Sequence, residues 1–171
     1  MSPEVPSFND LLAECDDSAV HLEMRDSYTP SDPVFLDWKA GHRIDGAQRY
    51  REWFDLVRTT VARGVHMRRI RIISEPLAAF IRFEYDVTSG LNVAAGEQVR
   101  WLPRRQASDL ALPGNDFWVF DGRIARFGHF AGNGDFVDHD VWEDPDVVKL
   151  CTSAFEAAWE RGIDHHDYRP A

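Results

Sequence analysis

The stretch that decides the fold is LPGNDFWVFDGRIARFGHF, residues 112–130. Its two apolar runs flank Asp121-Gly122, a tight turn whose glycine suits a hairpin. A second glycine-containing turn, residues 131–135, precedes a third short run, DFVDHDVW at residues 135–142. The spacing therefore predicts three antiparallel strands that follow one another in a meander.

Upstream of this hairpin, the pattern alternates between strand and helix. VHMRRIRIIS (residues 65–74) and EQVRWLP (97–103) have strand character, and PLAAFIRFEYDV (76–87) between them has helical spacing, with Ser74 as its expected cap. A strand, a helix and a second strand form a βαβ unit, which is normally parallel and right-handed. Together with the antiparallel meander, this unit predicts a mixed sheet.

The remaining segments are expected to be mainly helical. AVHLEMRDSY (residues 19–28) is the exception, because its alternation predicts a half-buried strand, and residues 163–171 are expected to form a loose polar tail. The first of these predicted helices begins at Ser7 or Asn9, and the second lies within residues 31–41. The third runs from Ala47 to Arg63, and the fourth runs from Pro145 to Gly162. We therefore expect one α/β domain over residues 1–171, with flanking helices, a helical N-terminal part (1–65), an α/β core (66–162) and the tail.

Composition narrows the class of protein. Of the 171 residues, 44% are apolar, which argues against a disordered chain, and no apolar run reaches the roughly 20 residues that a membrane-spanning helix needs. The first 17 residues lack the basic start and apolar stretch of a secretion signal, and Cys15 and Cys151 are expected to be buried and reduced. The formal net charge of −10 argues against direct binding to nucleic acid. We expect a cytoplasmic protein without membrane contact.

The hairpin and its surroundings resemble the phospholipase D-like superfamily. That superfamily carries His-x-Lys-x-x-x-x-Asp in a similar hairpin, where the histidine attacks phosphorus and the lysine holds phosphate oxygens. Counting back from Asp121 puts Gly114 at the histidine position and Asp116 at the lysine position. The resemblance therefore implies a degenerate phospholipase D-like fold without the histidine and lysine of that mechanism.

A second feature of chemical interest is the alternation in MRRIRII, residues 67–73. It places Arg69 and Arg71 on the face opposite Ile70 and Ile72, and buried guanidinium groups need partners. Two interpretations stay open. Arg69, Arg71 and Arg100 form an anion pocket that Glu23 and Glu75 orient, or the same residues form an ion-paired polar face open to solvent. Arg82 and Glu84 are candidates to join this network. The structural interpretation is favoured because structural ion networks imitate functional sites.

Four stretches resemble an uncharacterised actinobacterial family of unknown function, DUF6879. They are HLEMRDSY (21–28), RRIRIISEPLAAFIRFEY (68–85), NVAAGEQVRWLPR (92–104) and LPGNDFWVFDGR (112–123). Members of this family are encoded near helix-turn-helix regulators in Streptomyces-like genomes, so the resemblance implies an accessory or regulatory role. Asp116 and Trp118 are among the residues that match the family's motifs.

We therefore expect a non-catalytic domain that acts by protein binding, as the accessory partner of a helix-turn-helix transcriptional regulator. Neither a cofactor nor a metal is expected. The alternative is a sensor or enzyme that uses the arginine and glutamate face on an anionic ligand. The candidate binding residues are Glu23, Arg69, Arg71, Glu75, Arg82, Glu84, Arg100, Asp116 and Trp118.

Overall fold

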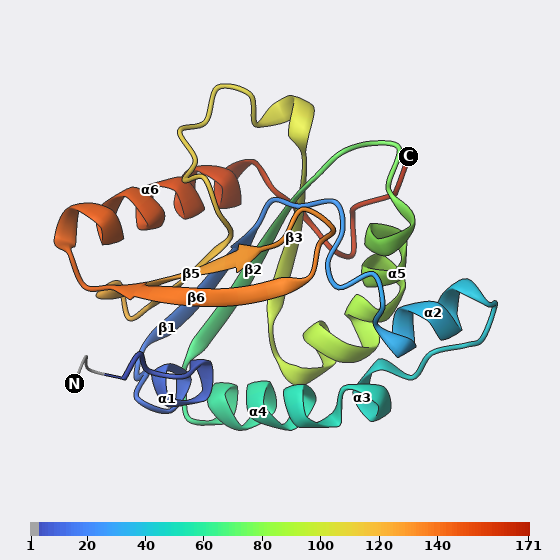
Figure 1. Ribbon diagram of the computed structural model, residues 1–171, viewed down its shortest axis with the longest axis horizontal. Coiled ribbons are helices and arrows are strands. Elements are labelled where there is room, and N and C mark those ends of the chain that lie inside the picture. The colour runs from blue at the N-terminus through green and yellow to red at the C-terminus, as the bar shows by residue number, and fades with distance from the viewer. Residues whose placement is uncertain (1–3) are drawn as a thin grey trace.

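The computed structural model describes residues 4–171 and is built on a mixed sheet of seven strands in the order β6-β5-β4-β1-β2-β3-β7 (Figure 1). β1, β2 and β3 are parallel, and the other neighbouring pairs are antiparallel. The predicted βαβ unit and the predicted meander are therefore both confirmed. The strands are β1 (Ser18–Glu23), β2 (His66–Ile73), β3 (Gln98–Pro103), β4 (Phe117–Phe120), β5 (Ile124–Phe130), β6 (Phe136–Trp142) and β7 (Ile163–Asp164).

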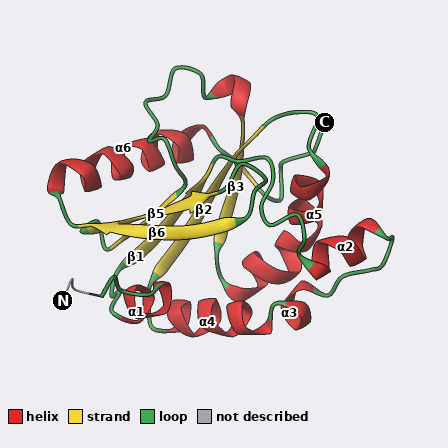
Figure 2. Ribbon diagram, viewed as in Figure 1, coloured by secondary structure: helices red, strands yellow, loops and turns green. Residues whose placement is uncertain are grey.

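Helices cover both faces of this sheet (Figure 2). The longest helix, α6, lies on one face, and the other helices gather on the opposite face. A π-helical turn, Ser89–Val93, continues α5. The helices are α1 (Phe8–Ala13), α2 (Pro33–Lys39), α3 (Gly46–Arg49), α4 (Arg51–Ala62), α5 (Ala79–Thr88) and α6 (Pro145–Arg161). Within the described residues, every helix is too short or too polar to cross a membrane.

The central strands are buried on both faces. On the α6 side, Leu22 and Ile70 pack against the apolar stripe of α6, which includes Phe155. On the other side, β1 presents Glu23, which is also buried. The prediction that residues 19–28 form a half-buried strand was therefore wrong about burial, because β1 lies between β4 and β2 in the middle of the sheet.

The Asp121-Gly122 hairpin also anchors the start of β1. Both residues have positive φ, 52° and 64°, as a type I′ turn requires. The Asp121 carboxylate accepts hydrogen bonds from the backbone N–H groups of Asp16, Asp17 and Ser18 at 2.9, 2.7 and 3.0 Å. Burial raises the pKa of this carboxyl group, but the hydrogen bonds from the three backbone N–H groups have the larger effect. They hold the pKa of Asp121 well below its ordinary value.

Two helix predictions were partly wrong, one about the continuity of a helix and one about where a helix begins. The helix expected from Ala47 to Arg63 is divided at Tyr50, whose hydroxyl donates to Asp32 at 2.6 Å. Ser74 does not cap the next helix, which begins only at Ala79. Instead, the backbone N–H and hydroxyl of Ser74 donate to the Asp26 carboxylate at 2.9 and 2.7 Å. In both cases a contact with a residue distant in sequence prevails over local helix signals.

The expectation of a loose C-terminal tail was also wrong. β7 pairs with β3 at the edge of the sheet, and the residues after it stay packed on Trp101. Tyr168 stacks on the Trp101 ring with centroids 5.5 Å apart, and Trp101 Nε1 donates to His165 Nδ1 at 3.0 Å. The tail therefore forms part of the core, because it covers an indole that would otherwise be exposed.

Replacing Asp121 with alanine should lower the free energy of unfolding by about 2 kcal/mol, since three backbone donors lose a charged acceptor. Urea unfolding at pH 7 measures this loss. Asp138→Ala, which removes an exposed carboxylate, is the matched control and should change the stability by less than about 0.5 kcal/mol. Equal losses in the two variants would contradict the anchoring role of Asp121.

Candidate binding site on the arginine face of the sheet

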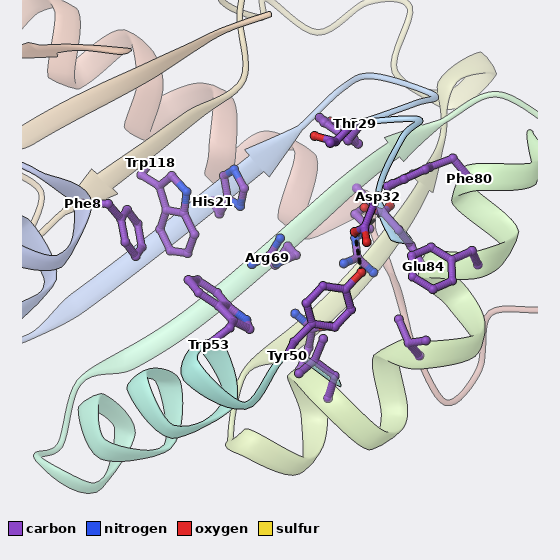
Figure 3. A pocket seen from close by; sticks show the side chains of 16 residues that line it. Phe8, His21, Thr29, Asp32, Tyr50, Trp53, Arg69, Phe80, Glu84 and Trp118 are labelled. Carbon is purple, nitrogen blue, oxygen red and sulfur yellow. Dashed lines mark hydrogen bonds and ion pairs between the residues drawn. The ribbon is translucent and has the colours of Figure 1, made fainter. Parts of the chain in front are cut away.

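Arg69 and Arg71 lie on one face of β2, as the alternation predicts, and both are buried. Their exposed fractions are 8% and 4%. In Figure 3, α4 and α5 border this face of β2. The interpretation as a polar face open to solvent is therefore wrong, while the prediction of an ion-paired network on this face is confirmed.

Arg69 is held between two buried carboxylates. Its Nη1 donates to Oε1 of Glu23, and its Nε donates to Oε1 of Glu97 at 2.5 Å. Asn92 Nδ2 donates to the second oxygen of Glu97 at 2.9 Å and so fixes this carboxylate. Although burial disfavours the charged guanidinium, Glu97 and Glu23 outweigh it and raise the pKa of Arg69. The positive charge of Arg69 is thus compensated twice.

Arg71 is less completely satisfied. Its Nη1 donates to the hydroxyl of Thr88 at 2.7 Å. Its Nε lies 3.6 Å from Oε2 of Glu23 and 3.6 Å from Oε2 of Glu84, which is within ion-pair range but too far for a hydrogen bond. Among the residues that the structure describes, Arg71 Nε and Glu84 Oε2 are therefore buried polar atoms without a hydrogen-bond partner.

The carboxyl groups around the arginines differ in their ionisation. Burial disfavours the Glu23 carboxylate, but Arg69 and Arg71 prevail and lower its pKa to about 2. For Glu84, burial exceeds the opposing effect of Arg71, and the charge of Glu23 adds to it, so its pKa rises to about 8. Burial also raises the pKa of Asp116 to about 6, although the Tyr28 hydroxyl donates to this carboxylate at 2.5 Å. Glu84 therefore carries a proton at neutral pH while Glu23 does not.

A cavity of about 380 Å³ opens over these groups (Figure 3). This volume lies in the range of sites that hold small molecules. At one end lie Trp53 and Trp118, with Arg69 between them at 5.7 and 5.6 Å from the ring centroids. The other end contains Asp32, Tyr50, Phe80 and Glu84, as Figure 3 shows. The remaining lining residues are Phe8, His21, Tyr28, Thr29, Arg71, Phe83, Val87, Leu91 and Asn92.

His21 is part of the aromatic end of the cavity. Its imidazole stacks on the Trp118 indole with centroids 4.2 Å apart, and its Nδ1 lies 3.5 Å from Oε1 of Glu23. Burial, with Arg69 as the next cause, lowers the pKa of His21 well below the ordinary value. The ring is therefore neutral at pH 7 and adds no positive charge to the cavity.

The structure brings together six of the nine predicted site residues. Glu23, Arg69, Arg71 and Glu84 form the ion network, and Trp118 lines the cavity. The sixth residue is Asp116, which accepts from the hydroxyl of the lining residue Tyr28.

The other three predicted residues lie elsewhere. Arg100 is opposite Ile70 in the β2–β3 register, so it points to the α6 face, where its Nη1 donates to the Trp159 carbonyl at 2.8 Å. Glu75 is exposed and accepts from the Tyr168 hydroxyl. Arg82 is also exposed, on the outer side of α5. Their inclusion in the network was therefore wrong.

Several residues of the site were missed in the sequence. Glu97 and Thr88 accept hydrogen bonds from the two arginines, and Asn92 donates to Glu97. Asp32 and Tyr50 form one end of the cavity. A signal for Glu97 was available, because it stands at the start of a strand that the βαβ unit places beside Arg69. No local signal identified Asp32, since it reaches the cavity through the fold of the chain between β1 and α2.

The raised pKa of Glu84 should make stability depend on pH. Its folded-state pKa of about 8 exceeds the ordinary 4.5, so the folded state binds more protons between these values, and the free energy of unfolding should fall as the pH rises through this range. Urea unfolding at pH 7.25, 7.6 and 8 measures the slope more than one pH unit above the pKa of Asp116, which is about 6. Glu84→Gln should flatten it.

The exposed carboxylate of Glu160 on α6 provides the matched control. Glu160→Gln should retain the slope of the unaltered protein. If Glu84→Gln retained it as well, Glu84 would be ionised in the folded protein across this pH range.

Comparisons with known proteins place the chain in a family. Among solved structures it is similar to Nuc, a phospholipase D family member from Salmonella typhimurium, with a TM-score of 0.51, 13% identity, and coverage of 98% of this chain and 94% of that one. It is also similar to NucT from Helicobacter pylori (TM-score 0.49, 11% identity, 91% and 87% covered) and to the archaeal chromatin protein TrmBL2 (0.49, 14%, 90% and 47%).

The likeness to Nuc confirms the predicted phospholipase D-like fold and, at this identity, shows the fold alone. No curated protein matches the sequence. A family model described as "Domain of unknown function (DUF6879)" matches residues 6–170. The chain therefore belongs to the DUF6879 family, in agreement with the resemblance seen in the sequence.

Proposed function

We propose that the chain is a non-catalytic binding domain whose cavity on the arginine face holds a small molecule. The observation that carries this proposal is the cavity of about 380 Å³, two of whose lining side chains, Arg71 and Glu84, have buried polar atoms without a hydrogen-bond partner in the described part of the chain. An unsatisfied buried polar group costs roughly 1–3 kcal/mol. A ligand that pairs with these atoms would recover part of that free energy.

The phospholipase D-like hairpin supports a binding role over hydrolysis by that superfamily's mechanism. Gly114, at the histidine position, has no side chain that could attack phosphorus. Asp116, at the lysine position, is buried and accepts a hydrogen bond from the backbone N–H of Met24 as well as from the Tyr28 hydroxyl. A carboxyl group in this place would repel phosphate oxygens rather than hold them.

The neutral fluorescent probe N-phenyl-1-naphthylamine tests whether the cavity accepts a small molecule. Its emission should rise saturably with the unaltered protein, because the cavity walls are largely aromatic. Val87→Phe adds a ring at a lining position and should weaken binding at least tenfold, on the order of 1.4 kcal/mol. Fluorescence titration measures both affinities.

Val137→Phe provides the matched control, since it makes the same change at an exposed position of β6 outside the cavity. It should bind the probe as the unaltered protein does. Equal weakening in both variants, or no saturable binding by the unaltered protein, would contradict the proposal.

A second candidate function is the docking of a partner protein on β6. This strand lies at an edge of the sheet, and it exposes Val137 to 61%, together with Phe136 and Trp142. An unpaired edge with apolar side chains can add a strand from another chain. Acidic side chains surround these residues, which favours a basic partner such as the basic face of a DNA-binding domain. They are Asp135, Asp138, Asp140, Glu143, Asp144 and Asp146.

The proposed partner is a helix-turn-helix transcriptional regulator, as the family resemblance implies, and a cytoplasmic location goes with it. Affinity capture of the tagged chain from an actinobacterial host, analysed by mass spectrometry, should recover such a regulator in stoichiometric amount. The variant Asp138→Lys/Asp140→Lys should reduce the recovery at least tenfold, because it reverses the charge of the edge.

The control variant Glu52→Lys/Glu160→Lys makes the same change in charge on α4 and α6 and should retain the regulator. If both double variants retained the regulator equally, or the unaltered chain recovered none, docking on β6 would be wrong.

A further inference from the structure

We infer that the cavity takes a cationic ligand, namely a planar apolar molecule that carries a protonated amine. This inference rests on the proposed function and names the chemical class of its ligand. Its first basis is the balance of ionisable groups in and directly behind the cavity wall. Two guanidinium groups, those of Arg69 and Arg71, stand against five carboxyl groups, which belong to Glu23, Asp32, Glu84, Glu97 and Asp116.

The two arginines are poorly placed to receive an anion. Arg69 already donates to Glu23 and Glu97, and its guanidinium lies between two indole rings. Arg71 donates to Thr88, and one carboxyl oxygen each of Glu23 and Glu84 lies 3.6 Å from its Nε. An anionic ligand would have to displace buried carboxylates from these partners, which is strongly unfavourable. The charges therefore argue against the anion pocket considered from the sequence.

Glu84 is the group that a ligand cation would meet. Among residues 4–171, its Oε2 has no hydrogen-bond partner, and its side chain is only 14% exposed. The ionisable groups that face Glu84 come from several elements. Arg69 and Arg71 lie on β2, Glu23 lies on β1, and Asp116 lies in the segment before β4. Tyr28 and Tyr50 lie in loops. A cation that binds beside Glu84 can replace the proton of this carboxyl group and compensate the negative charge that remains. The ionised carboxylate would then pair with both the cation and Arg71 Nε.

Asp32 supplies a second acceptor at the same end of the cavity. Its carboxylate accepts from the Tyr50 hydroxyl at 2.6 Å and from the Val34 backbone N–H at 2.8 Å. Burial raises the pKa of Tyr50, and Asp32 and Glu84 add to this increase, so both carboxyl groups lie near the Tyr50 hydroxyl at this end of the cavity (Figure 3). Two carboxyl groups that converge on one end can share an ammonium group, which has three donors.

The aromatic end of the cavity suits the apolar body of such a ligand. Phe8 packs edge-on against Trp118 at 4.9 Å, and Trp53 lies 6.1 Å from the same indole ring. Planar groups and cations are both favoured next to indole faces. The ligand would thus lie along the cavity, with its ammonium at Glu84 and its ring toward Trp53 and Trp118.

Three probes of similar size and different charge test this inference. They are tryptamine, indole-3-propionamide and indole-3-propionate. In isothermal titration at pH 8, tryptamine should bind at least tenfold more tightly than the propionate, with the neutral amide between them. The tryptamine affinity should fall about tenfold per pH unit below pH 8, because binding must release the Glu84 proton, whose pKa is about 8.

Glu84→Gln separates the role of this carboxyl group from the shape of the cavity. The amide resembles the protonated acid in size and shape, so the variant should keep the fold, while tryptamine should lose at least tenfold in affinity together with its pH dependence. Glu160→Gln is the matched control on the exposed side of α6 and should leave tryptamine binding unchanged.

The outcomes distinguish this inference from the proposed function. Tighter binding of the propionate, or unchanged tryptamine binding in Glu84→Gln, would overturn the cationic class while the cavity kept its binding role. Binding of N-phenyl-1-naphthylamine without any binding of tryptamine would do the same. Failure of every probe, the naphthylamine included, would overturn both.

Discussion

The pairing of Arg69 with Glu23 and Glu97 is the constraint on which the rest of the structure depends. A buried guanidinium group is tolerated only where carboxylates and hydrogen bonds compensate it. Here β1 supplies one carboxylate, and the residue just before β3 supplies the other, which Asn92 of the π-helical turn holds in place. This pairing therefore joins three parallel strands and the end of α5 at one point. It also fixes the polar floor over which the cavity opens.

Local patterns in the sequence predicted the elements that depend on local chemistry. Alternation in residues 19–28 predicted β1, the βαβ pattern predicted β2 and β3, and the two glycine-containing turns predicted the meander of β4 to β6, because glycine readily adopts the positive φ that such turns need. The break at Tyr50 and the packed tail were not predictable in this way. Tyr50 is held by Asp32, and Tyr168 by Trp101, so both features depend on partners that only the complete fold brings near.

The same distinction explains which site residues were found. Alternation within one strand placed Arg69 and Arg71 correctly, but the face of Arg100 depends on the register between β2 and β3, which pairs it with Ile70. On α5, the inward positions Phe80, Phe83, Glu84 and Val87 follow helical spacing, so the phase of this helix could have excluded Arg82. The cavity itself was not predictable, since it depends on how Asp32 and Tyr50 approach β2.

The phospholipase D-like hairpin contributes to the charge of the cavity in an unexpected way. In the superfamily's motif, the position of Asp116 carries a lysine that holds phosphate oxygens. Here the same position places a carboxyl group beside Tyr28, and its charge is one cause of the raised pKa of Glu84. The fold thus presents an acidic excess around this cavity. That excess supports our preference for a cationic ligand, because Asp116 is one of the five carboxyl groups that stand against only two guanidinium groups there.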